Sequence, residues 1–329
     1  MKNQTEIRNQ NLSLVRNVFA YEETLVASQI AQKTGLSVVT VNAILDEMCK
    51  SGEMEKQGLS NSGNGRPSTL YRYNRQHYCG LVLFAYNSGD RIILNTLAVN
   101  LYGEVLNEVT ESHAEIGETH ILNAVEGCMR AFPRTGRLVL GLPGIERHGV
   151  VTSGDFASFI DTAFIERIGE RFRLRIAFMN DINAAVYGHY KNSETACENE
   201  AGVFFPTRFP PGAGIILNGE LYLGDTGFAG EIAHLSGPAH WSDLYRVGEE
   251  EIAKQIYPIV RSIICVLNPG RVVLYGEYLT AGILELVQNE VRSVFPAAAV
   301  PEILLLHTFE ADFKNGLIAF IKDKLWEGL

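Results

Sequence analysis

Residues 176–189 read Ile-Ala-Phe-Met-Asn-Asp-Ile-Asn-Ala-Ala-Val-Tyr-Gly-His. The apolar residues 176–179 predict a strand, and residues 182–189 predict a helix that follows it almost at once. Asn180 and Asp181 stand at the junction. A strand that passes directly into a helix is the building unit of α/β proteins. The stretch therefore predicts an α/β fold, and its position alone suggests that Asp181 caps the helix.

Strand and helix patterns alternate through the rest of residues 79–329. The predicted strands are Leu81–Ala85, Arg91–Val99, Leu138–Gly141, Ile176–Met179, Ala201–Phe205, Gly214–Leu217 and Arg271–Tyr275. The predicted helices are His120–Ala131, Ile160–Arg171, Ile182–His189, Glu249–Leu267 and Tyr278–Val294. Because single cores stop growing at roughly 250–300 residues, we expect two lobes. We place them at residues 76–185 and 186–329, with the C-terminal helix packing back on the first lobe.

The first 75 residues predict a separate winged helix-turn-helix domain. Apolar residues at helical spacing indicate a helix at 27–34, which Gly35 ends, and a second helix at 38–50, which Ser37 caps. A short turn with glycine at this place is typical of a helix-turn-helix. Met54–Gln57 and Leu70–Tyr73 are expected to pair as the wing, around the Gly- and Ser-rich linker at 60–68.

Charge separates the same two parts of the chain. The protein has 329 residues and a net charge of −10. Residues 1–78 carry a net charge of +2 and residues 79–329 carry −12. An acidic body repels nucleic acid, so any contact with DNA must come from the N-terminal domain.

The second helix of a helix-turn-helix reads bases in the major groove with its first residues. Here the outward residues include Ser37, Val38, Thr40 and Asn42. Asn42 suits adenine, Val38 suits a thymine methyl group, and the two hydroxyls suit phosphate oxygens. Arg66, between Gly65 and Pro67, is expected to enter the minor groove. The alternatives are that the helices dock a protein instead and that Arg66 is a solvated linker residue.

Composition excludes several other classes of protein. The chain has 46% hydrophobic and 20% charged residues, which is typical of a globular protein. The five cysteines are far apart and form no Cys-x-x-Cys pair, so a disulfide framework is not expected. No apolar run reaches the ~20 residues of a membrane span, and residues 1–6 are too polar for a signal peptide. We therefore expect a cytoplasmic protein.

Several motifs in order resemble the ROK family of repressors and sugar kinases. They are the winged helix, Gly65-Arg66-Pro67, residues 141–144 (Gly-Leu-Pro-Gly), 180–185 (Asn-Asp-Ile-Asn-Ala-Ala), 212–222 (Gly-Ala-Gly-Ile-Ile-Leu-Asn-Gly-Glu-Leu-Tyr) and 227–234 (Gly-Phe-Ala-Gly-Glu-Ile-Ala-His). The resemblance implies a two-lobed, actin-like and hexokinase-like (ribonuclease-H-like) ATPase-type body with a sugar between the lobes. It also implies a homo-oligomer as the form that binds DNA.

The chain departs from the kinases of this family at both phosphate loops. Their first loop, Asp-x-Gly-x-Thr, has no counterpart in residues 80–91, and their second loop is replaced by Arg208-Phe209-Pro210-Pro211. Backbone amides bind phosphate where small residues let it approach, and proline has no N–H to offer. We therefore expect no nucleotide, no cofactor, no catalytic residue and no phosphoryl transfer.

The family's zinc site is also missing from the sequence. In the family, the residue matching His234 is joined by a run of cysteines, but residues 235–243 contain none. Because structural zinc in such sites needs thiolates, we expect no metal. The second sugar-binding glutamate of the family has no clear match among residues 249–251.

The resemblance implies that Asn180, Asp181, Glu231 and His234 bind the sugar. Carboxylates and amides suit vicinal hydroxyl groups because they accept or donate paired hydrogen bonds. The residue matching Asp181 is the general base of the kinases, but without a phosphoryl donor it can only bind. The alternatives are a helix cap for Asp181, a favourable first-turn acid for Glu231 and a buried core histidine for His234.

These observations predict a transcription regulator, most simply a repressor, that responds to a sugar or sugar derivative between the lobes. Its expected partner is a palindromic double-stranded DNA operator, bound by a homodimer or a dimer of dimers. Two alternatives stay open: a ligand-independent DNA-binding or scaffold protein with a dead sugar pocket, and a ROK sugar kinase with an added DNA-binding domain.

Overall fold

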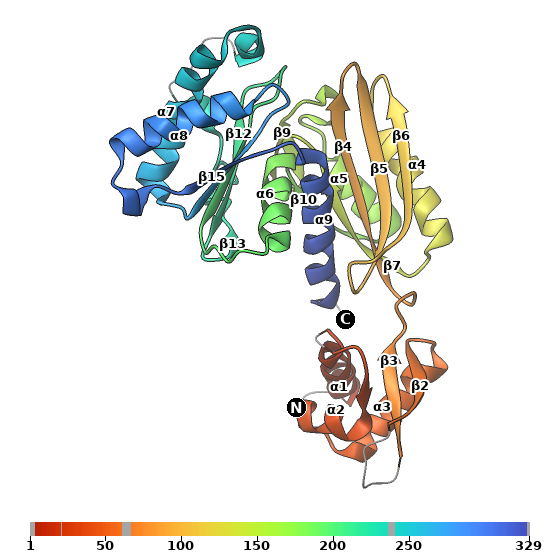
Figure 1. Cartoon of the computed structure of the whole chain (residues 1–329). Helices are drawn as coiled ribbons and strands as arrows, with labels where there is room; N and C mark the ends of the chain where they lie inside the picture. Colours follow the sequence, from red (N-terminus) through yellow and green to blue (C-terminus); the bar gives the residue numbers. More distant parts are fainter. Residues whose placement is uncertain (1–3, 21, 61–66, 236–240, 328–329) are drawn as a thin grey trace.

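The computed structural model describes residues 4–20, 22–60, 67–235 and 241–327. A small N-terminal unit lies beneath a body of two lobes, and helix α9 runs from between the lobes toward that unit (Figure 1).

The N-terminal unit combines helices with a small antiparallel sheet of order β1-β3-β2. Its elements are α1 (Gln4–Val18), β1 (Leu25–Val26), α2 (Ala27–Thr34), α3 (Val38–Lys50), β2 (Met54–Ser60) and β3 (Ser68–Tyr73). The predicted helices 27–34 and 38–50 are confirmed to the residue. Gly35 ends α2 with a φ of 71°, and the Ser37 hydroxyl accepts a hydrogen bond from the Thr40 amide at 3.0 Å. The sequence did not predict β1, which is too short to show a pattern.

The first lobe is a sheet of order β10-β7-β4-β5-β6. Its strands are β4 (Cys79–Ser88), β5 (Arg91–Asn100), β6 (Val105–His113), β7 (Thr135–Gly141) and β10 (Arg175–Met179). Leu81, Leu83 and Ala85 pack in one core cluster, whereas Val82 and Phe84 pack in another, so alternate residues of β4 serve opposite faces. The cluster that holds Leu81 also contains residues of α4 (Glu118–Ala131) and α5 (Phe164–Phe172).

One sequence expectation for this lobe is wrong, and one strand was not predicted. The helix predicted from Ile160 begins at Phe164, because residues 157–159 form a 3-10 turn and Asp161 has a φ of 56°. Strand β6 was missed because most of its residues are polar and exposed at the edge of the sheet. Beyond β7, the hairpin β8 (Ile145–Arg147) and β9 (Val150–Ser153) projects toward the second lobe.

The second lobe repeats the same plan with a sheet of order β13-β12-β11-β14-β15. Its strands are β11 (Glu200–Phe204), β12 (Gly212–Leu217), β13 (Glu220–Leu221), β14 (Arg271–Tyr275) and β15 (Glu302–Leu306). Its core includes α7 (Glu249–Leu267) and α8 (Ala281–Val294). The prediction for α7 is confirmed to the residue, whereas α8 begins three residues later than predicted, where Thr280 caps it.

Helices α6 (Asp181–Asn192) and α9 (Phe309–Trp326) pack against each other between the two sheets. A Cβ atom on Gly188 or Gly316 would overlap a backbone oxygen of the opposite helix, so the glycines permit this close crossing. Helix α6 packs on the second sheet and α9 on the first, which brings the C-terminal helix back onto the first lobe. The predicted lobe boundary at residue 185 therefore falls inside α6, where no break in the chain occurs.

Candidate functional site

Two adjoining cavities lie between the lobes, outside the carboxyl ends of strands from both sheets. One encloses about 360 Å³ and contains Asn180, Glu231 and His234; we call it the polar cavity. The other encloses about 220 Å³ beside Tyr86 and Phe309; we call it the aromatic cavity. They share the walls formed by Pro143, Asp155, Asp181, Phe204, Pro206 and Phe209. Open α/β sheets bind ligands at such crevices.

Asn180 and Asp181 enter the polar cavity because β10 ends and α6 begins there. Asn180, not Asp181, is the cap of α6: its side-chain oxygen accepts a hydrogen bond from the Asn183 amide at 2.9 Å. Asp181 lies in the first turn, where its Oδ1 accepts from the Ile182 amide at 2.9 Å. The interpretation of Asp181 as the helix cap is therefore wrong.

Burial raises the pKa of Asp181 to about 6. The hydrogen bond from the Ile182 amide opposes this shift, and the negative charge of Glu231 adds to it. Burial likewise raises the pKa of Glu231, although the nearby His234 favours its charged form. Perturbed carboxyl groups in a cleft are typical of functional sites.

Glu231 and His234 reach the cavity from the loop after β13 and the short turn η2 (Ile232–His234). Gly230, with a φ of 93°, precedes them, and a Cβ atom there would overlap the backbone oxygen of Ala213. His234 is exposed, so the alternative of a buried core histidine is wrong. All four residues suggested as sugar ligands thus line one cavity.

Asp155 is a further cavity residue that the sequence reasoning missed. It lies in both cavities and accepts a hydrogen bond from Asn87 Nδ2 at 3.3 Å. Burial and the charge of Asp181 raise its pKa to about 7. Its loop is held by the close approach of Gly144 and Gly154, where a Cβ atom on either glycine would overlap backbone. In the sequence, the motif Gly141-Leu142-Pro143-Gly144 marks the segment that packs against this loop. It does not indicate Asp155 itself.

The aromatic cavity is lined by residues of both segments that replace the phosphate loops of the kinases. Strands β4 and β5 are joined by a two-residue turn, Gly89-Asp90. In the wall of the cavity, Phe204 stacks on Phe309 with ring centres 3.8 Å apart. An ion pair of 2.7 Å joins Arg208 to Asp90, and so connects a loop of each lobe at the surface.

The residues predicted to contact DNA lie at the start of α3. The Ser37 and Thr40 hydroxyls are 2.8 Å apart, and Asn42 is exposed. Val38 is 46% exposed and Val39, which the sequence reasoning did not select, is 80% exposed. Val39 lies on the face of α3 opposite the buried Val41. This position relative to the buried face was the sequence signal that would have selected it. Arg66 lies outside the described residues, as do residues 236–240, which belong to the segment that lacks the cysteines of the family's zinc site.

Within the described residues, no group of three or more His, Cys, Asp or Glu side chains is arranged to hold a metal ion. The same part of the chain contains no helix with the length and apolar character needed to cross a bilayer.

Comparison with known sequences finds a family match over part of the chain. Residues 92–243 match the sequence model of the ROK family. The xylose repressor of Caldicellulosiruptor bescii is 25% identical over 246 residues, which cover 71% of this chain and 60% of that protein. The DNA-binding transcriptional dual regulator NagC of Escherichia coli is 24% identical over 216 residues, or 63% of this chain and 52% of NagC. The match spans about three fifths or less of the length of these curated relatives.

Solved structures agree on the fold. A ROK family transcriptional regulator, described as a homologue of E. coli MLC protein, aligns over 97% of this chain and 99% of its own with a TM-score of 0.64 at 14% identity. A ROK hexokinase from Thermus thermophilus aligns over 76% of this chain and all of its own, with a TM-score of 0.62 at 19% identity. The predicted two-lobed, hexokinase-like α/β body is therefore confirmed. Within that body, residues 92–243 are similar to the ROK family model.

Proposed function

We propose that this protein is a transcription regulator, and specifically a repressor, that binds operator DNA through its N-terminal unit under the control of a sugar in the polar cavity. The observation that carries the proposal is helix α9, which begins beside the cavities and ends against the N-terminal unit. The names of the xylose repressor and of NagC support the same role.

The N-terminal unit has the parts of a winged helix-turn-helix. Helix α3 is the recognition helix and the β2–β3 hairpin is the wing. The exposed Val38 and Val39 suit thymine methyl groups, and Asn42 suits the edge of adenine. The net charge of +2 on residues 1–78, against −12 on the rest, favours this unit for DNA. A homodimer would present two such helices to a palindromic operator.

The polar cavity suits a neutral sugar. Asp155, Asp181 and Glu231 offer acceptors to hydroxyl groups, and His234 offers a further polar group at the exposed side. Burial disfavours the charged form of the three carboxyl groups. A ligand whose hydroxyls donate hydrogen bonds to them would stabilise the charged form and offset this cost.

Phosphoryl transfer is disfavoured by the same geometry. The two-residue turn at Gly89-Asp90 presents no loop of free amides, and Pro210 and Pro211 carry no N–H group. We therefore assign Asp181 a binding role and no role as a general base.

Helix α9 supplies a physical route between sugar and DNA. At its start, Phe309 and Glu310 line the aromatic cavity. At its end, the Trp326 ring contacts Tyr73 of β3 edge-on, with centres 5.7 Å apart, and its Nε1 donates to the Leu101 oxygen of the first lobe at 2.8 Å. Lobe closure that moves α9 would thus move Trp326 against the N-terminal unit. A coupling of ~1–3 kcal/mol is typical of allosteric proteins.

The test begins by selecting bound sequences from random duplex DNA and measuring their affinity by fluorescence anisotropy at a fixed salt concentration. Asn42→Ala should weaken binding by about 5- to 100-fold and relax the preference at one base pair, because a bidentate contact with adenine is worth ~1–3 kcal/mol. The matched control is Asn17→Ala, at an exposed residue of α1, which should change affinity less than about twofold. Binding without sequence preference would contradict the proposal.

Sugar control is tested separately with the selected DNA. A sugar that raises the melting temperature should also change the affinity for DNA. Trp326→Ala should retain sugar binding while losing most of that change. If no sugar alters the affinity, the ligand-independent alternative is supported instead, and ADP formation from ATP with any hexose would favour the kinase.

A further inference from the structure

The aromatic cavity is a second compartment that the proposed sugar site leaves unused. It continues from the polar cavity across Asp155 and Asp181, which belong to both. Its other walls come from the ends of β4, β11, β14 and β15, so it is bounded by both lobes. A ligand that fills both compartments would therefore touch both lobes at once.

The walls of this compartment suit the apolar face of a flat ring. Tyr86, Phe204 and Phe309 line it. Phe204 and Phe309 stack on each other with ring centres 3.8 Å apart, so a ligand meets only the sides of these rings that face away from the stack. The face of an aromatic ring carries a partial negative charge that attracts weakly positive C–H groups. A pyranose ring offers such C–H groups on its face and hydroxyls at its edge.

The polar residues around the compartment suit the hydroxyls of such a ring. Asn87, Arg208, Glu277 and His307 together offer both donors and acceptors. The charges also discriminate between ligands. The acidic residues of the wall (Asp155, Asp181, Glu277 and Glu310) outnumber the basic residues (Arg208 and His307). This balance disfavours a phosphate and favours a neutral second unit.

We propose that the ligand of this protein is a neutral disaccharide, with one ring in the polar cavity and the second ring in the aromatic cavity. The inference rests on the proposed sugar control and adds the size and charge of the sugar. The bond between the two rings passes Asp155 and Asp181, where the two compartments meet. The second ring lies beside Phe309, at the start of the helix that ends against the N-terminal unit.

Isothermal titration calorimetry on the full chain tests this inference. Cellobiose, maltose, lactose and sucrose are each compared with their component monosaccharides, and with glucose 6-phosphate and ATP with Mg²⁺. At least one disaccharide should bind ten or more times more tightly than either of its components. Neither phosphorylated compound should bind as tightly as that disaccharide.

Two tryptophan variants locate the second ring. Thr207 lines the aromatic cavity and not the polar one, so Thr207→Trp should fill the space and reduce disaccharide affinity at least tenfold, to that of the monosaccharide. Monosaccharide affinity should stay within twofold. Thr119→Trp, at an exposed residue of α4, is the matched control and should change neither. Thermal melting confirms that each variant folds.

The outcomes separate this inference from the proposed function. If monosaccharides bind and change DNA affinity while each disaccharide binds no better, the disaccharide inference is overturned and sugar control stands. An equal effect of Thr207→Trp on both sizes of sugar, or tighter binding of ATP, overturns it as well. If no sugar binds and DNA binding persists, sugar control itself fails.

Discussion

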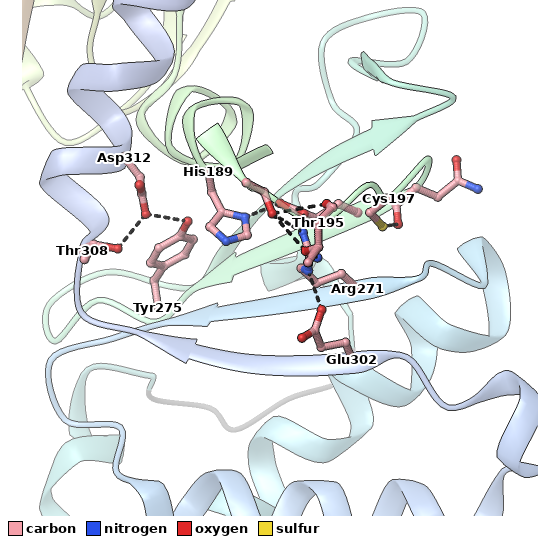
Figure 2. Close-up of polar contacts among 11 residues, drawn as sticks. His189, Thr195, Cys197, Arg271, Tyr275, Glu302, Thr308 and Asp312 are labelled. Atoms are coloured by element: carbon pink, nitrogen blue, oxygen red, sulfur yellow. Dashed lines mark hydrogen bonds and ion pairs between the residues drawn. The ribbon is translucent and has the colours of Figure 1, made fainter. Parts of the chain in front are cut away.

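Two polar clusters at opposite ends of α6 differ in how their charges are paired. At the end of the helix, Arg271 donates to Glu200 at 3.0 Å and to Glu302 at 2.8 Å, while His189 Nδ1 lies 2.7 Å from Glu200 (Figure 2). We call this the paired cluster. At the start of the helix lie Asp155, Asp181 and Glu231, and no ion pair reaches these carboxyl groups among the described residues. We call this the unpaired cluster.

The difference teaches how to separate structural charges from binding charges. In the paired cluster, burial alone would lower the pKa of Arg271, but the bonds to Glu302 and Glu200 outweigh it and raise that pKa. In the unpaired cluster, burial raises the pKa of all three carboxyl groups. A buried charge that is paired with an opposite charge of the protein serves the stability of the fold. A buried charge without such a pair is available to a ligand.

The largest expected effect is on the paired cluster. Arg271→Met should lower the free energy of unfolding by about 3–5 kcal/mol, because it leaves Glu200 buried without its cation. Urea unfolding followed by circular dichroism measures the change.

Arg208→Met is the matched control for that prediction. Arg208 and its partner Asp90 are 57% and 93% exposed, so the loss of their ion pair should change stability by less than about 1 kcal/mol. If both variants lose the same free energy of unfolding, the buried ion pairs of the paired cluster stabilise the protein no more than the exposed pair does.

The helices show which parts of the fold could be predicted from the sequence. The helices at 27–34, 38–50 and 249–267 could be predicted because each has one buried face and a clear start or stop residue. Helix α9 could not be delimited in the same way. It packs against a sheet and against α6, so its apolar residues do not gather on one face.

The site residues likewise include some that the sequence suggested and one that it did not. Asn180, Asp181, Glu231 and His234 were suggested by short motifs, and they line the polar cavity. Asp155 was not suggested, because its place depends on a contact between Gly144 and Gly154 across a loop. Such a long-range backbone contact has no periodic pattern in the sequence, so only the folded chain brings Asp155 beside Asp181.

The next effect concerns binding and belongs to the unpaired cluster. Glu231→Gln should weaken binding of a sugar by about 10- to 100-fold, since a hydrogen bond to a charged group is worth ~1.5–3 kcal/mol. Stability should change by less than about 1 kcal/mol, because the amide has the same shape and no charge to bury. Calorimetry and urea unfolding measure the two quantities.

Glu285→Gln, at an exposed residue of α8, controls for the loss of a carboxylate elsewhere. It should alter neither sugar affinity nor stability. A large loss of stability in Glu231→Gln would place Glu231 with the structural charges and remove the contrast between the clusters.

A smaller effect is expected from pH. The folded protein keeps a proton on Asp155 up to about pH 7, whereas the unfolded chain releases it near pH 4. The free energy of unfolding therefore falls as the pH rises between these values. Asp155→Asn carries no charge, so relative to the unmodified protein it should gain about 1–2 kcal/mol at pH 8 and almost nothing at pH 4.

Urea unfolding at pH 4, 6 and 8 measures this gain, with Asp225→Asn as the control at an exposed residue. A gain that is the same at each pH would show that the carboxyl charge of Asp155 is not the cause. A loss of stability at pH 8 would mean that Asp155 has a cationic partner and belongs with the paired charges.

The smallest effect is expected at the solvent-exposed side of the paired cluster. Glu302 accepts from Arg271 Nε at 2.8 Å, but its side chain is 54% exposed, whereas that of Glu200 is fully buried. Glu302→Gln should therefore lower the free energy of unfolding by less than about 1 kcal/mol, because water screens the lost charge and the amide oxygen still accepts the hydrogen bond. Glu200→Gln should cost clearly more in the same urea titration. If the two variants lose equal stability, burial does not set the strength of these ion pairs. The contribution of each pair to stability would then depend on its geometry alone.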